Sequence, residues 1–146
     1  MATPLRIAEA PAVYDRMGEL FDLELQSEGD AVRLAEAGVT SKAYKRAAKV
    51  LNFPASLIAP ETTVRRRLKN NARFSEAESE RLIRLARVYA EAVELFGDEA
   101  AALRWLNTPQ AFIEGQPPVA PLHLAAKDAG ARLIENLLRQ TAHGVF

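Results

Sequence analysis

The side chains best suited to bind another molecule are concentrated in one short basic segment, residues 41–73. This segment holds nine Lys and Arg residues and one acidic residue, Glu61, although the whole chain has 19 basic and 19 acidic residues. A local electropositive surface of this kind attracts polyanions over long distances. The charge alone leaves a second interpretation equally open, namely a solvated helix surface that acidic neighbours balance.

Within this segment the sequence has the outline of a helix-turn-helix. Two short helices are expected over residues 41–51 and 61–70, joined by a tight turn, with Val64 and Leu68 spaced to face the core. Hydroxyl groups and N–H groups at a helix start suit phosphate oxygens, and arginine suits both phosphates and guanine edges. The candidate DNA-contacting residues are Thr62, Thr63, Arg65, Arg66 and Lys69.

The sequence contains no recognisable catalytic constellation. It has no cysteine, no Gly-x-Gly-x-x-Gly loop, no phosphate-binding loop and no His-Glu-x-x-His motif. Of the two histidines, His123 lies between two leucines and is expected to be partly buried, whereas His143 is expected at the surface. The sequence therefore predicts a protein that is not an enzyme and that has neither a metal site nor a cofactor.

The composition is that of a protein that folds in water. The chain has 146 residues, of which 49% are apolar and 26% are charged, a mixture that excludes a disordered or collagen-like chain. No apolar stretch approaches the roughly 20 residues that cross a bilayer. The first residues also lack the pattern of a secretion signal. We expect a cytoplasmic protein without membrane contact.

The elements that position these residues are predicted to be helices, so the fold class is mainly α. The clearest helix spans residues 75–96, because Ser75 and Glu78 form a capping box and Gly97 follows the last turn. Its expected buried stripe is Leu82, Leu85, Tyr89 and Val93. Its expected exposed face, tolerant of alanine substitution, is Glu80, Arg84, Arg87 and Glu91.

Changes in composition along the chain divide it into three parts. Residues 1–26 are expected to be an N-terminal extension that packs on the body or on a second subunit, and residues 27–73 the helix-turn-helix part. Residues 74–146 form a C-terminal helical part with an extended, proline-rich loop over residues 107–120. A last helix is expected to begin near Pro121 or Asp128.

A set of motifs in the second half of the chain resembles the Xre/MbcA/ParS antitoxin family. The resemblance covers roughly residues 60–146 and rests on the motifs as a set. They are Thr63-Val64-Arg65-Arg66-Arg67-Leu68, Phe74-Ser75, Glu78-Ser79-Glu80-Arg81-Leu82, Arg84-Leu85-Ala86-Arg87, Phe96-Gly97-Asp98, Ala101, Trp105-Leu106, Pro109, Gly115, Pro121-Leu122, Gly130-Ala131, Leu137 and His143-Gly144-Val145-Phe146.

The resemblance implies an antitoxin with a Cro-like helix-turn-helix part and a C-terminal toxin-binding part. Its usual partner is a RES-domain toxin, which consumes NAD or uses it to ADP-ribosylate a target. The antitoxin covers the entrance to the toxin's active site and, with the toxin, represses its own operon by binding operator DNA. It acts as a homodimer or as a higher hetero-oligomer with the toxin.

The residues expected to contact the toxin lie in the C-terminal part. They are Gly115, Lys127, Gly130, Arg132, Arg139, Gly144, Val145 and Phe146. The chain departs from the family in two places. Lys127 stands where threonine is common, and the loop before Pro121 is longer.

Two other functions remain open from the residues. The first is a stand-alone DNA-binding repressor that has no toxin partner and whose C-terminal helices make it a dimer. The second is a helical adaptor without a DNA role. A neighbouring gene for a RES-type protein distinguishes the antitoxin from the stand-alone repressor, and a mobility-shift assay identifies the adaptor.

Overall fold

A computed structural model describes the backbone of residues 4–142 and the side chains of residues 12–141. The described chain is built from helices, which confirms the predicted fold class, and its one extended pairing is an isolated bridge between Gln110 and Val119. The elements are α1 (Pro4–Phe21), α2 (Glu28–Ala37), α3 (Ser41–Leu51), the 3-10 turn η1 (Ala55–Leu57), α4 (Glu61–Lys69), α5 (Glu76–Phe96), α6 (Glu99–Asn107), α7 (Pro121–Leu124) and α8 (Asp128–Ala142).

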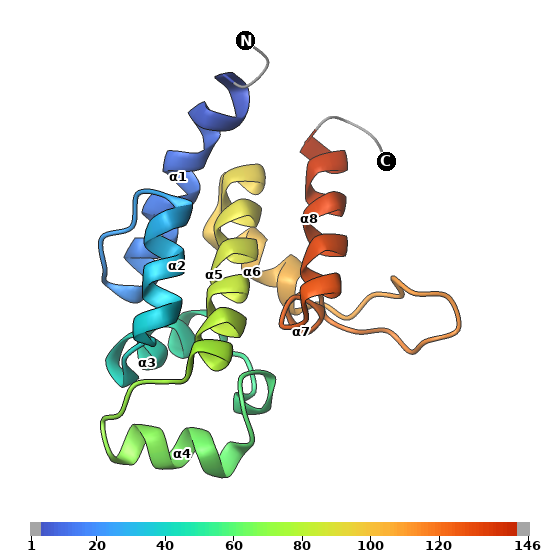
Figure 1. Ribbon diagram of the computed structural model, residues 1–146. Helices are drawn as coiled ribbons and strands as arrows, with labels where there is room; N and C mark the ends of the chain where they lie inside the picture. Colours follow the sequence, from blue (N-terminus) through green and yellow to red (C-terminus); the bar gives the residue numbers. More distant parts are fainter. Residues whose placement is uncertain (1–3, 143–146) are drawn as a thin grey trace.

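The long helix α5 lies at the centre of the molecule (Figure 1). The predicted capping box is present, since Ser75 Oγ accepts a hydrogen bond from the Glu78 N–H and Glu78 Oε1 accepts one from the Ser75 N–H. Gly97 ends the helix in the left-handed conformation, with φ of 69°. Helices α1, α2, α3, α6, α7 and α8 all contact α5, so it forms the spine of the hydrophobic core.

The buried side of α5 is wider than its sequence pattern indicates. All four residues of the predicted stripe are buried, as expected. Of the face expected to be exposed, however, only Glu80 is exposed, because α2 and α8 also pack on this helix. Arg84 donates hydrogen bonds to the backbone oxygen of Ala126, at 2.8 and 3.3 Å. Glu91 is half-buried, and its Oε1 atom is shielded from solvent.

Residues 1–26, expected to be an extension, contain α1. This helix packs on α5 and α3, and Met17 and Phe21 near its C-terminal end are fully buried. The described part of the segment is therefore built into the core of its own chain. Where the chain divides into domains stays a prediction.

The junction between α2 and α3 is fixed by buried polar contacts with distant segments. Gly38 has φ of 90°, and a Cβ atom there would lie 2.4 Å from the backbone oxygen of Phe74. The next N–H group, that of Val39, donates to the buried Ser79 Oγ of α5 at 2.8 Å. Ser41, the first residue of α3, donates to the backbone oxygen of Ala72 at 2.7 Å, and Thr40 caps the helix. These contacts hold α3 against α5.

The C-terminal part consists of α6, a projecting loop, and the pair α7 and α8. The loop leaves the body as an arm and returns to it (Figure 1), closed at its base by the Gln110–Val119 bridge. The last helix, α8, begins at Asp128, one of the two expected starts, and the other expected start, Pro121, begins the separate short helix α7. Gly130 lets them approach, because a Cβ atom there would lie 2.0 Å from the backbone oxygen of Leu124.

None of the described helices is long and apolar enough to cross a membrane.

Candidate functional site

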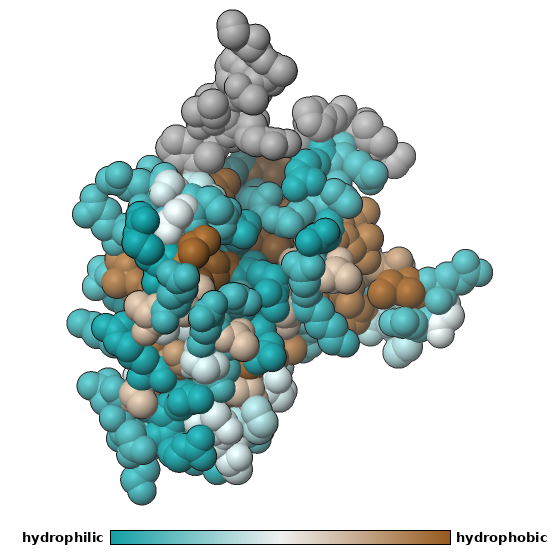
Figure 2. Space-filling view, in the orientation of Figure 1, coloured by the Kyte–Doolittle hydropathy of each residue, from teal (hydrophilic) through white to brown (hydrophobic). Residues whose placement is uncertain are grey.

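The predicted DNA-contacting residues lie on α4, at the end of the molecule far from the C-terminal end of α8 (Figure 1). Thr62, Arg65, Arg66 and Lys69 are exposed and Thr63 is half-buried. These side chains face solvent because Val64 and Leu68 turn the other side of α4 toward the core, as their spacing predicts. Val64 is buried and Leu68 packs partly against the core. Figure 2 shows that the surface at this end is mostly hydrophilic.

The prediction of a tight turn between the two helices of the basic segment is wrong. The connection between α3 and α4 takes residues 52–60 and includes η1, because Pro54 and Pro60 interrupt helical hydrogen bonding there. A short connection of the length typical of helix-turn-helix motifs, residues 38–40, joins α2 to α3 instead, and it contains a glycine.

Three of the nine basic side chains of this segment are engaged within the protein. Arg46 of α3 donates a long hydrogen bond to the backbone oxygen of Glu19, at 3.5 Å. Arg67 pairs with Glu78 of α5, with a closest N–O distance of 2.7 Å, and Arg73 donates to the Gly38 oxygen at 2.9 Å. Burial acts to raise the pKa of Glu78, but hydrogen bonds from Arg67 and the Ser75 backbone hold that pKa below its usual range.

Seven basic side chains of α3 and α4 are exposed. They are Lys42, Lys45, Arg46, Lys49, Arg65, Arg66 and Lys69. We call this set the basic face. Only the three basic side chains on α4 were predicted to contact DNA. The four on α3 nevertheless recur at the three- and four-residue steps that put side chains on one side of a helix.

The predicted toxin-contacting residues fall into three groups in the structure. Gly115 lies at the exposed tip of the arm, with φ of 80° and open space around it. Lys127, Arg132 and Arg139 are exposed at the start of α8 and along it. Gly130 is near these residues in the sequence, but it faces α7, where it allows the close contact between α7 and α8. Gly144, Val145 and Phe146 lie outside the described residues.

The two arginines of α8 make only local, solvent-exposed contacts. Arg132 pairs with Asp128 one turn earlier, at 3.2 Å, and Arg139 donates to the Asn136 side chain at 2.8 Å. Exposed pairs of this kind contribute little to stability. Both guanidinium groups can therefore exchange these contacts for a partner's groups at little cost.

A row of partly exposed aromatic residues, which the sequence analysis missed, lies at the base of the arm. The rings of Phe96 and Trp105 have centroids 6.0 Å apart, and those of Trp105 and Phe112 6.5 Å apart. Phe96 is 37% exposed. Figure 2 shows hydrophobic surface gathered where the arm meets the body beside α8. Aromatic side chains dominate the energetics of many protein interfaces.

Comparison with known proteins finds a family model that is similar to the C-terminal region. Residues 91–144 match the family model described as the antitoxin Xre/MbcA/ParS C-terminal toxin-binding domain. The resemblance to the Xre/MbcA/ParS antitoxins is confirmed. The matched region contains the arm, the aromatic row, Lys127 and both exposed arginines of α8, whereas α4 lies outside it.

Curated relatives of the Xre/MbcA/ParS type are similar over a longer stretch. The chain is 38% identical over 88 residues to Antitoxin Xre of Yersinia enterocolitica, a match that covers 60% of this chain and 57% of the relative. It is 31% identical over 87 residues to Antitoxin Xre of Pseudomonas putida, covering 60% of this chain and 53% of the relative. The matched stretch thus spans little more than half the length of these relatives.

Proposed function

We propose that this protein is an antitoxin that binds and neutralises a toxin through its C-terminal part. The observation that carries the proposal is the match of residues 91–144 to a toxin-binding domain. The same residues present an arm, an aromatic row and exposed cationic side chains to solvent. This is the combination of an apolar centre and a polar rim that protein partners bind. The protein itself carries out no catalysis in this proposal.

The toxin that best fits the resemblance is a RES-domain enzyme that uses NAD, blocked at its active site. NAD carries a negatively charged pyrophosphate, and a cleft that accepts it offers positive potential or hydrogen-bond donors. A glycine-tipped arm can enter such a cleft because it brings backbone groups close without a bulky side chain. The cations Lys127, Arg132 and Arg139 then contact acidic groups around the entrance.

Shortening the arm is expected to weaken toxin neutralisation without affecting the fold. Deleting residues 114–117 removes four exposed residues and leaves the bridge between Gln110 and Val119 available to close the shorter loop. Cells that express a RES-domain toxin should grow when they also express the full-length protein and grow poorly when they express the shortened one. Circular dichroism should give the same helicity for both proteins.

Two results would count against this part of the proposal. Full protection by the shortened protein would place the blocking group elsewhere, at Lys127 or in residues 143–146. Failure of the full-length protein to bind or neutralise the RES-domain protein would favour the second candidate function, a stand-alone repressor. The basic face supports that candidate as well as the antitoxin, because both bind DNA.

We further propose that the protein binds operator DNA through the basic face and so represses its own operon, as a homodimer or in a complex with the toxin. Seven exposed cations on two neighbouring helices, with a single acidic residue in the segment, provide the electrostatic attraction that all DNA binding needs. The basic face and the arm lie at different places on the molecule (Figure 1). DNA and toxin could therefore be bound together.

Replacing Arg65, Arg66 and Lys69 with alanine is expected to weaken operator binding. Each lost phosphate contact lowers the log–log salt slope by about one, and each lost base contact costs about 1–3 kcal/mol on the operator. The matched variant replaces Lys42, Lys45 and Lys49 of α3, which removes the same charge. If α4 reads the bases, its variant loses the preference for operator over random DNA, whereas the α3 variant weakens binding to both equally.

Mobility shifts on operator and random DNA at several salt concentrations make this comparison. Unchanged operator affinity of the α4 variant, with the helicity intact, would remove α4 from the DNA contact. Loss of sequence preference in the α3 variant alone would make α3 the reading helix, as its short connection to α2 permits.

A further inference from the structure

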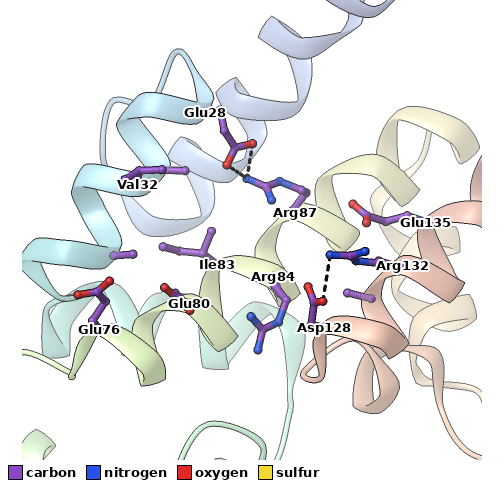
Figure 3. A pocket seen from close by; sticks show the side chains of 13 residues that line it. Glu28, Val32, Glu76, Glu80, Ile83, Arg84, Arg87, Asp128, Arg132 and Glu135 are labelled. Carbon is purple, nitrogen blue, oxygen red and sulfur yellow. Dashed lines mark hydrogen bonds and ion pairs between the residues drawn. The ribbon is translucent and has the colours of Figure 1, made fainter.

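A groove of about 390 Å³ runs along α5 between α2 and α8, away from the arm and the basic face. Helices α2 and α8 each pack on α5 and so form its two walls. Figure 3 shows Val32 and Ile83 between the charged side chains that rise from the three helices. This surface has no role in the function proposed above.

The floor of the groove is apolar and made largely of small side chains. Ala31 and Ala35 of α2 and Ala131 of α8 line it, with Val32 and Ile83 between them. Val32 is 50% exposed and is one of the few large apolar side chains that the described structure leaves in solvent. Small residues on a helix surface let another backbone approach closely, so the shape suits an added helix.

The basic side chains at the rim of the groove all have partners within the protein. Arg87 pairs with Glu28 at 2.8 Å, and Arg132 pairs with Asp128 at 3.2 Å. Arg84 donates to the Ala126 oxygen. These contacts use all three arginines that line the groove.

The remaining acidic side chains of the rim have no basic partner. Across residues 12–141, none of Glu76, Glu80 and Glu135 forms an ion pair. The carboxyl group of Glu135 lies close enough to that of Glu91 to raise its pKa. The groove therefore combines an apolar floor with unbalanced negative charge. A segment that complements it carries apolar side chains flanked by Lys or Arg, and DNA is repelled from it.

We propose that this groove seats a cationic amphipathic helix of the toxin, as a second contact besides the arm. The inference rests on the proposed function, since it takes the partner to be the toxin. Charge complementarity selects the chemistry of the helix, and the wall formed by α8 belongs to the matched toxin-binding region. The opposite wall, α2, lies outside that region, so the toxin would contact both parts of the chain.

The test measures toxin affinity for two groove variants and two matched controls. Glu80→Lys reverses an exposed charge in the groove, and Glu36→Lys makes the same change on α2 at a residue that does not line it. Val32→Ser removes the exposed apolar side chain, and Val50→Ser does so at a valine of α3 that is 41% exposed. The probe is a purified RES-domain toxin made catalytically inactive and titrated calorimetrically.

We expect each groove variant to bind the toxin at least tenfold more weakly than its control, with unchanged helicity. Glu80→Lys should also reduce the salt dependence of binding. Groove variants that bind as tightly as their controls would overturn the inference and leave the proposed function standing. A wild-type protein that does not bind the toxin would overturn both. A wild-type dimer that Val32→Ser converts to monomers in size-exclusion chromatography would assign the groove to a second copy of this chain and also overturn the inference.

Discussion

Truncating Leu85 to alanine is expected to lower the free energy of unfolding by about 2–5 kcal/mol. Leu85 is completely buried near the middle of α5, the helix on which most of the other helices pack. The substitution removes the transfer free energy of the deleted methyl groups and leaves a cavity that rigid neighbours fill only in part. Since small domains are stable by only about 5–15 kcal/mol, the loss is a large part of the total.

Urea unfolding followed by circular dichroism measures this effect. The control is Glu80→Ala on the same helix, where the side chain is exposed, and it should change the free energy of unfolding by no more than about 0.5 kcal/mol. A Leu85→Ala protein as stable as the Glu80→Ala protein would mean that α5 does not organise the core as the structure describes.

The second expected result is a loss of stability as pH rises from about 5 to about 8, caused by Glu91. Burial, and then the hydrogen bond and charge of Glu135, raise the pKa of Glu91 to about 8, although Arg139 and Arg87 act in the opposite direction. In the unfolded chain the same carboxyl group returns to its ordinary pKa of 4.5. The folded protein therefore holds a proton that the unfolded chain releases.

The sign of the pH dependence follows from this difference. Below about pH 4.5 both states are protonated and the stability contribution is fully present. Between the two pKa values unfolding releases a proton, so each rise in pH favours the unfolded state by up to about 1.4 kcal/mol per pH unit. Above the folded pKa the contribution is lost. Glu78, with its lowered pKa, titrates at more acidic pH and does not affect this window.

Thermal melts at pH 5, 6, 7 and 8 of the wild type and of Glu91→Gln test the assignment. Glutamine resembles the protonated carboxyl group and cannot ionise, so the variant should lose less stability across this range than the wild type. Glu80→Gln, a change on the exposed part of the same helix, should behave as the wild type does. Equal losses for the wild type and Glu91→Gln would mean that another group causes the pH dependence.

The sequence predicts features whose cause is local. The capping box of Ser75 and Glu78 and the closing Gly97 lie within the helix that they delimit, and α5 was predicted almost to the residue. The exposure of Arg65, Arg66 and Lys69 likewise follows from Val64 in the same helix. In each case the residues that decide the outcome are a few positions apart in the chain.

Features that depend on distant partners escaped prediction. Arg84 and Glu91 occupy what reads as the polar face of α5, and only the packing of α8 turns that face inward. The pairing of Arg67 with Glu78 and the contact of Gly130 with Leu124 depend on how helices meet. The groove has the same origin, because its lining residues come from three helices and no single segment carries its pattern.

The central position of α5 has a consequence for how proteins with this arrangement of helices can exchange parts. Helix α5 packs against α1, α2 and α3 and also against α6, α7 and α8. A hybrid that joins the N-terminal half of one relative to the C-terminal half of another would place foreign side chains on this shared helix. Recombination between relatives should therefore succeed only where their versions of α5 have matching buried side chains on both sides.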